Sequence, residues 1–177
     1  MHLLTQQQQT LMALSAAALD AGDEISAASY HRLAGITKDQ RAYLAAKFMN
    51  TNARHALECF LWSEDDEEGN PLDGLDHKCS IELLKRIDSD WNSFRKQAEE
   101  MGFDAEQHCA GTLHSDCDGD AWNAAAHDFI LTRNHHGTGF WDTGRWEEPW
   151  DDRLTKLSHT FEELHGYIND ENEIDAE

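Results

Sequence analysis

The stretch SIELLKRIDSDWNSFRKQAEEMG, residues 80–102, decides the fold of this 177-residue chain, because it has the most regular hydrophobic pattern in the sequence. Its apolar residues recur three and four positions apart, at Ile81, Leu84, Ile87, Trp91, Phe94, Ala98 and Met101. That spacing places them on one face of an α-helix. Ser80 can cap the first turn, and Gly102 can end the last one. The pattern therefore predicts one long amphipathic helix between these two residues.

Helical patterns also precede this stretch. Thr5 followed by Gln8, and Thr37 followed by Gln40, are typical of capping boxes at the start of two helices. A further helix is expected after Asn52, and its buried side chains would be Ala53, Leu57, Phe60 and Leu61. Residues 63–76 are rich in Asp and Glu and also contain Gly, Asn and Pro, which predicts a solvated loop.

The C-terminal part is expected to contain β-structure. Residues 128–133 and 138–142 are rich in β-formers and flank the turn-like residues 134–137, which predicts a β-hairpin. Residues 103–120 have no periodicity and predict a loop. A last helix is expected from about Asp152 to Gly166, and residues 167–174 either add a short strand or fray.

These elements predict an α+β fold that is mainly helical. N-terminal helical hairpins and the long amphipathic helix would pack on a small antiparallel hairpin or sheet near the C-terminus. Residues 1–51 form a charge-neutral helical region, and residues 52–177 form an acidic α+β region. No Gly/Ser linker separates the two regions, which predicts one compact unit.

The net charge lies almost wholly in the second region. Residues 1–60 hold five acidic and five basic residues, whereas residues 61–177 hold thirty acidic and nine basic residues and carry the full net charge of −21. Such a surface repels nucleic acid and anionic membranes, and it attracts cations and basic protein surfaces. The charge therefore disfavours direct binding of DNA or RNA and predicts a basic partner protein.

Other features predict a cytoplasmic protein. Four cysteines at irregular spacings are too few for a disulfide framework and indicate reduced thiols. The apolar run at residues 11–19 has no preceding Lys or Arg, which disfavours a signal peptide, and no run reaches the ~18 apolar residues of a membrane-spanning helix. The common hydrolase and nucleotide-binding motifs are absent, so an enzyme is the less favoured interpretation.

One loop has residue types that bind zinc. Thiol and imidazole side chains could close a tetrahedral site formed by His108, Cys109, His114 and Cys117. Only His114 and Cys117 have the tight spacing that zinc sites usually use, and all four residues lie within ten positions. A polar loop without metal is therefore favoured over zinc binding, which stays open as an alternative.

The same loop resembles the beginning of an EF-hand calcium loop. Asp116, Asp118 and Asp120 place carboxylates at alternate positions, as that loop does. Ala121 stands where the loop needs glycine, and His127 stands where it needs a bidentate glutamate. Strong calcium binding is therefore disfavoured.

A third group consists of His127, His135, His136 and Asp142, which surround the expected hairpin. These residue types serve as metal ligands or as general acids and bases. Two adjacent histidines in a tight turn do not both face one metal without an unusual backbone. The favoured interpretation is that His135 is exposed and that His136 bonds the backbone of the turn.

Aromatic and acidic residues together suggest a surface that binds a protein partner. Trp146 and Trp150 flank a proline, so they either pack in the core or act as exposed anchors beside an acidic rim. The acidic residues expected to contact the partner are Glu64, Asp65, Asp66, Glu67, Glu68, Glu147, Glu148, Asp151 and Asp152.

Residues 128–144, with the sequence DFILTRNHHGTGFWDTG, resemble a motif of small acidic proteins encoded by bacteriophages and plasmids. The likeness covers about residues 52–174 and does not reach the N-terminal helices. It also departs at residues 167–174, where such proteins usually end in a glycine-bearing aromatic hairpin. The resemblance implies a bacterial host but no particular activity, and its motif residues are Arg133, Asn134, His136, Gly137, Trp141 and Asp142.

The motif can also be explained by folding alone. Gly137 and Gly139 permit a positive φ or a close approach of the backbone, and Asn134 tolerates the left-handed region. Arg133 and Asp142 would lie near the two strand ends and pair across them. This account needs no catalysis, so the motif is first of all a folding unit.

Three functions remain open. The leading hypothesis is an acidic, phage-encoded protein that imitates the phosphate charge of nucleic acid and inhibits a nucleic-acid-binding protein of the host, such as part of a defence system. One alternative is a zinc-binding protein or metal-dependent enzyme that uses residues 109–136. The other is an assembly protein that forms homo-oligomers through its N-terminal helices.

Overall fold

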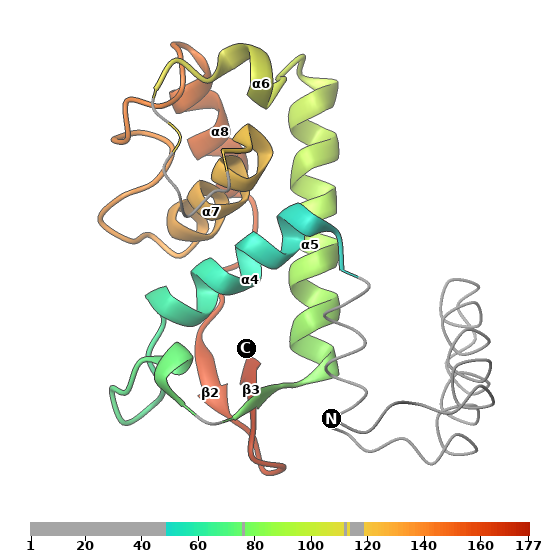
Figure 1. Cartoon of the computed structure of the whole chain (residues 1–177), viewed down its shortest axis with the longest axis vertical. Helices are drawn as coiled ribbons and strands as arrows, with labels where there is room; N and C mark the ends of the chain where they lie inside the picture. Colours follow the sequence, from blue (N-terminus) through green and yellow to red (C-terminus); the bar gives the residue numbers. More distant parts are fainter. Residues whose placement is uncertain (1–48, 76, 112, 114–118) are drawn as a thin grey trace, which may run out of the picture. The chain divides into compact units, whose positions relative to one another are not determined.

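The computed structural model describes residues 49–75, 77–111, 113 and 119–177 (Figure 1). The chain divides into two units, residues 1–44 and 45–177, and every element described below belongs to the second unit. The helices expected from the capping boxes at Thr5 and Thr37 lie outside the described residues. Within the second unit the expected α+β class is confirmed.

The helix α5 (Ile81–Glu100) is the longest described element and runs along the length of this unit (Figure 1). The Ser80 hydroxyl accepts a hydrogen bond from the Leu83 amide at 2.9 Å, as an N-cap does. After the last turn, Gly102 adopts a φ of +92°, which favours glycine. The buried residues of the helix are Leu83, Leu84, Ile87, Trp91, Phe94 and Ala98. The predicted amphipathic helix is therefore confirmed.

Two further helices, α4 (Thr51–Ser63) and α7 (Ala121–Arg133), lie side by side and run in the same direction. Near their beginnings, Asn52 Nδ2 donates a hydrogen bond to Asn123 Oδ1 at 2.6 Å. Just beyond their ends, Asn134 Nδ2 donates to Glu64 Oε1 at 2.9 Å. The helix expected after Asn52 is therefore present, with Ala53, Leu57 and Phe60 buried and Leu61 half-buried.

The β-hairpin predicted at residues 128–142 is wrong, because residues 128–133 belong to α7 and residues 138–142 form turns. The Asp120 carboxylate caps α7 by accepting a hydrogen bond from the Asn123 amide at 3.0 Å, and alanines follow with high helix propensity. Nearly all of α7 is buried, and α4, α6 and α8 all contact it. A helix buried on every side has no polar face, so its sequence lacks a helical period and resembles a strand.

Short helices complete the helical part. The helix α6 (Ala105–His108) occupies part of the expected loop at residues 103–120. The 3₁₀ turn η1 (Leu72–Gly74) lies near the end of the acidic loop that was expected at residues 63–76. The helix α8 (Trp150–Ser158) begins close to the expected start but ends well before Gly166. Residues 159–165 instead form a connector in which Leu164 is fully buried.

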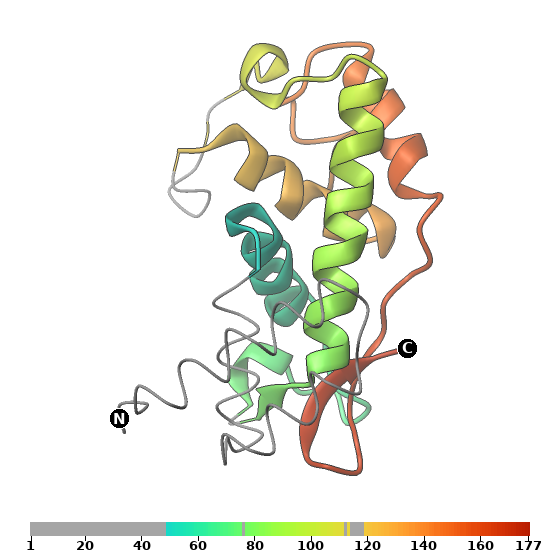
Figure 2. The same ribbon diagram turned by 90° about the vertical axis from the view of Figure 1, so that its right-hand side faces the viewer.

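A three-stranded sheet lies where α5 begins (Figure 2). Its strands are β1 (Lys78–Cys79), β2 (Gly166–Ile168) and β3 (Glu173–Ala176), and β3 is the central one. The pairing of β3 with β1 is parallel, and its pairing with β2 is antiparallel, with Tyr167 opposite Asp175. The expected small sheet near the C-terminus is therefore built by the tail of the chain and not by residues 128–142.

None of the helices in the described ranges is long and apolar enough to cross a membrane.

Candidate functional site

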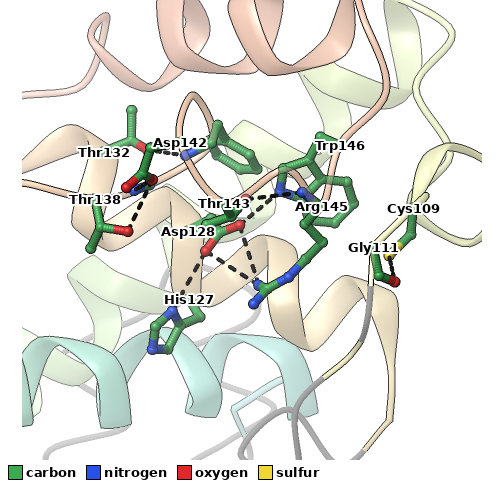
Figure 3. Close-up of polar contacts among 12 residues, drawn as sticks. Cys109, Gly111, His127, Asp128, Thr132, Thr138, Asp142, Thr143, Arg145 and Trp146 are labelled. Carbon is green, nitrogen blue, oxygen red and sulfur yellow. Dashed lines mark hydrogen bonds and ion pairs between the residues drawn. The ribbon is translucent and has the colours of Figure 1, made fainter.

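The motif at residues 128–144 begins with a buried carboxylate, that of Asp128 on α7 (Figure 3). Trp146 Nε1 donates a hydrogen bond to Asp128 Oδ2 at 2.7 Å, and Arg145 Nη1 donates to both carboxylate oxygens at 3.3 Å. His127 Nδ1 lies 3.6 Å from Asp128 Oδ1. A buried carboxylate is costly unless it is paired and hydrogen-bonded, and Arg145 and Trp146 meet both requirements. This network fixes residues 145–146 onto α7.

The turn after α7 is held by the hydroxyl of Thr132 and the carboxylate of Asp142 (Figure 3). Thr132 Oγ1 accepts a hydrogen bond from the Phe140 amide at 3.0 Å. Asp142 Oδ1 accepts from the Gly139 amide at 2.8 Å and from Thr138 Oγ1 at 3.0 Å. Gly139 has a φ of +154°, and a β-carbon there would collide with Thr132 Oγ1. Both features require glycine at this position.

The expected ion pair between Arg133 and Asp142 does not form, because Arg133 points away from the turn. Its Nη1 donates to Asp90 Oδ2 on α5 at 3.0 Å, and its Nε donates to the carbonyl of Glu162 at 2.9 Å. Its guanidinium also lies 5.3 Å from the ring centre of Phe129. Burial lowers the pKa of Arg133, and the bond to Asp90 opposes that shift. Arg133 therefore links α7, α5 and the connector after α8.

A second polar network joins the ends of α4 and α7. The Glu64 carboxylate accepts hydrogen bonds from Asn134 Nδ2 at 2.9 Å and pairs with His136 Nε2 at 2.8 Å. Asn134 also donates to the carbonyl of Leu164 and accepts from its amide. The Glu64 side chain is 12% exposed, so its assignment to the partner-binding surface is wrong. His136 bonds Glu64 and not the backbone of the turn, whereas His135 is exposed as expected.

Most of the motif residues singled out in the stretch 128–144 thus stabilise the fold. Arg133, Asn134 and His136 each bond a distant segment of the chain, and Asp142 holds its own turn. Gly137 and Trp141 are exposed instead. The interpretation of the motif as a folding unit agrees with these contacts, although its secondary structure differs from the expected hairpin.

Trp146 and Trp150 are buried, so their interpretation as exposed anchors is wrong. Trp150 packs against Phe103 and His108, with ring centres 5.3 and 5.0 Å apart. The large exposed indoles of the described residues are those of Trp62, which is 50% exposed, and Trp141, which is 43% exposed. Trp62 lies outside the buried stripe of α4, and this helical position is the sequence signal that could have identified it.

The expected acidic contact residues separate into two groups. Asp65, Glu67 and Glu68 are exposed in the loop between α4 and η1, near the sheet. Residues 147–152 lie at the opposite end of α5, beside α6, where the Glu147 amide bonds the carbonyl of His108 at 3.2 Å. In that second group Asp152 pairs with Lys156 at 2.7 Å. The expected acids therefore do not form one patch.

The acidic loop that contains Asp65, Glu67 and Glu68 lies beside the C-terminal tail. The side chain of Leu72 in η1 packs directly against Gly166 in β2, which brings the acidic loop beside the β2–β3 hairpin. We call the carboxylates of these two segments the acidic end: Asp65, Asp66, Glu67, Glu68, Asp73, Asp170, Glu171, Glu173, Asp175 and Glu177. All ten are exposed or half-buried, and neither residues 65–73 nor residues 170–177 contain Lys or Arg.

The negative charge of the acidic end contributes to the raised pKa values of Tyr167 and Cys79. The pKa of Tyr167 is raised, chiefly by the negative charge of Asp175. The pKa of Cys79 is raised to about 11, first by burial and then by the charges of Asp175 and Glu173. Within the acidic loop, hydrogen bonds from the backbone and side chain of Asn70 lower the pKa of Asp66.

The structure does not test the complete zinc site. His114 and Cys117 lie outside the described residues, as do Asp116 and Asp118. Across the ranges that are described, no three His, Cys, Asp or Glu side chains are arranged to hold a metal ion. Cys109 is half-buried, its thiol contacts the Gly111 carbonyl, and desolvation raises its pKa.

The remaining histidine and aspartate candidates do not converge on one point. Asp120 caps α7, Asp142 holds the turn, and His136 bonds Glu64. His127 faces Trp62 and Asp128. Each of these side chains has a separate structural contact, so the arrangement offers no shared catalytic or metal-binding centre among them.

Comparison with known proteins gave no match to a family model, to a curated protein or to a solved structure.

Proposed function

We propose that this chain is an acidic binding protein that occupies the cationic, nucleic-acid-binding surface of a partner protein through its acidic end. The observation that carries the proposal is the concentration of ten carboxylates on two segments that the fold brings together. Nucleic acid presents a dense row of negative charges to its binding proteins, so a surface of this kind competes for the same cationic groups.

The balance of charge in residues 49–177 supports the proposal. Residues 1–48 hold four acidic and four basic residues, so residues 49–177 hold 31 acidic and 10 basic residues and the entire net charge of −21. Two of those ten cations, Arg133 and Arg145, are buried against Asp90 and Asp128. Each of these pairs is neutral, so the net charge of −21 belongs to the other residues of this range.

The frame beneath the acidic end also supports the proposal. Ile174 of β3 is buried, and the Ser80 amide at the start of α5 bonds its carbonyl at 2.8 Å. The acidic tail is thus anchored to the longest helix and is not a free, solvating extension. Carboxylates held on a fixed frame lose less conformational entropy on binding than carboxylates on a flexible tail.

The test compares two sets of neutralised acids. One variant carries Asp65→Asn, Glu67→Gln, Glu68→Gln and Asp170→Asn, and the matched control carries Glu147→Gln, Glu148→Gln, Asp151→Asn and Asp152→Asn at the other end of α5. Each protein is used to capture partners from a bacterial lysate treated with nuclease, at increasing salt. We expect capture of a basic nucleic-acid-binding protein that added DNA or RNA displaces and that salt weakens steeply.

The two variants should then differ. Neutralising the acidic end should weaken the affinity for the captured protein about tenfold at low salt, which corresponds to about 1.4 kcal/mol, and the control should change it much less. Equal effects of the two variants, or capture that DNA and RNA do not displace, would contradict the proposal.

A further inference from the structure

Trp62 presents an accessible indole beside the acidic end. It lies in the last turn of α4, and half of its surface is accessible. Its ring stacks on the His127 ring, with centres 5.7 Å apart and planes inclined by 28°. His127 contacts the indole, and half of the Trp62 side chain stays accessible. Tryptophan is enriched among the residues that anchor protein interfaces.

The indole is held in place by groups that are themselves fixed. His127 belongs to the buried helix α7, and its Nδ1 lies 3.6 Å from the buried Asp128 carboxylate. Asp128 in turn is bonded to Arg145 and Trp146 (Figure 3). An aromatic side chain that is already ordered loses little conformational entropy when a partner binds to it.

Several acidic residues lie close to Trp62 in the sequence. Glu58 lies one turn earlier on the same face of α4 and is exposed, and Asp65, Glu67 and Glu68 follow in the exposed loop. No Lys or Arg occurs from residue 55 to residue 77, although this stretch contains eight acidic residues. A cation near the indole therefore gains from the electron-rich ring and from the neighbouring carboxylates.

We propose that Trp62 is the aromatic anchor of the acidic end and that its accessible indole receives the guanidinium group of an arginine in a cationic segment of the partner. Arginine fits better than lysine, because its planar guanidinium stacks on an aromatic ring while its donors reach the carboxylates. This inference rests on the proposed function and adds to it the kind of side chain that the surface selects.

The test uses two peptides of defined chemistry, nona-arginine and nona-lysine, and measures their affinities by isothermal titration calorimetry at low salt. Trp62→Ala should weaken binding of nona-arginine about two- to fivefold and binding of nona-lysine less. Trp62→Phe should restore part of the loss, because it keeps an aromatic face. Trp141→Ala is the matched control, since Trp141 is similarly exposed but lies on another segment, and it should change neither affinity.

The outcomes separate the inference from the proposed function. One outcome is that Trp62→Ala binds both peptides like the wild type, whereas the variant with four neutralised acids at the acidic end binds neither. That outcome refutes Trp62 as the anchor and leaves the proposed function in place. If the wild type binds neither peptide at low salt, the proposed function fails as well. Equal losses for Trp62→Ala and Trp141→Ala would also refute the anchor.

Discussion

The region of residues 128–146 and the acidic end use the same kinds of charged side chain in opposite ways. Around α7 the buried charges form ion pairs. Arg145 pairs with Asp128, and Arg133 pairs with Asp90. At the acidic end the carboxylates are accessible and of one sign, and the charge of Asp175 is the main cause of the raised pKa of Tyr167. The buried pairs link segments of the fold, whereas the accessible carboxylates are the groups that we propose bind a partner.

The largest expected effect tests whether the buried charges are structural. Asp128→Asn removes the countercharge of Arg145 and should lower the free energy of unfolding by about 3 to 5 kcal/mol, because a buried guanidinium is left uncompensated. Urea denaturation followed by circular dichroism measures the change. Asp152→Asn, at an exposed ion pair, should change it by less than about 1 kcal/mol. Similar losses for both variants would remove the contrast between buried and exposed charges.

The next effect concerns the turn that fixes the motif to α7. Gly139→Ala should lower the free energy of unfolding by about 1 to 3 kcal/mol, because its φ of +154° is unfavourable for alanine and Thr132 occupies the space. Gly137→Ala is the matched control, since nothing lies within 4 Å of its added carbon and its φ is not left-handed. The same denaturation experiment should show a change of at most about 0.5 kcal/mol for the control.

A pH effect is expected at the acidic end. The Cys79 thiol has an ordinary pKa of 9.0 and a pKa of about 11 in the fold. Below pH 9 the thiol is protonated in both states, and above it the unfolded chain loses the proton first. The free energy of unfolding should therefore fall between pH 9 and pH 11, and Cys79→Ala should reduce this fall. Urea titrations across that range measure it, and identical slopes for both proteins would contradict the shift.

The smallest effect measures the field of the acidic end. In a protein with Tyr30→Phe and Tyr43→Phe, Tyr167 is the sole tyrosine, so its ionisation can be followed by phenolate absorbance. Asp175→Asn should lower the pKa of Tyr167, because Asp175 is the main cause of its increase. Asp152→Asn, at the other end of α5, should leave it unchanged. Equal shifts for the two variants would mean that the charge is not concentrated at the sheet.

The two regions also differ in what the sequence predicted. The periodic stripes of α4 and α5 identify these helices because each has one polar face and one apolar face. The helix α7 has no such pattern, since neighbours cover it on nearly every side, and its Phe-Ile-Leu-Thr run is equally typical of a strand. Helical residues without a polar face can be recognised only when their neighbours are known.

The positions of the acidic residues in the fold could also be predicted only in part from the sequence. Glu64 follows directly on α4 and precedes four other acids, yet it alone of these is hydrogen-bonded to Asn134 and His136 of the α7 terminus. The sequence predicted an acidic surface but placed part of it at residues 147–152. The tail joins the acidic loop because Leu72 packs against Gly166, a contact between residues 94 positions apart. Such a contact leaves no local signal in the sequence.

The most direct test of the central claim maps where a cationic ligand binds. The ¹⁵N-labelled protein is titrated with nona-arginine at low salt, and the amide chemical shifts are followed by NMR. We expect the largest changes in residues 62–73 and 166–177, and we expect them to vanish at high salt. Changes centred on residues 147–152, or spread evenly over the accessible acids, would contradict the claim.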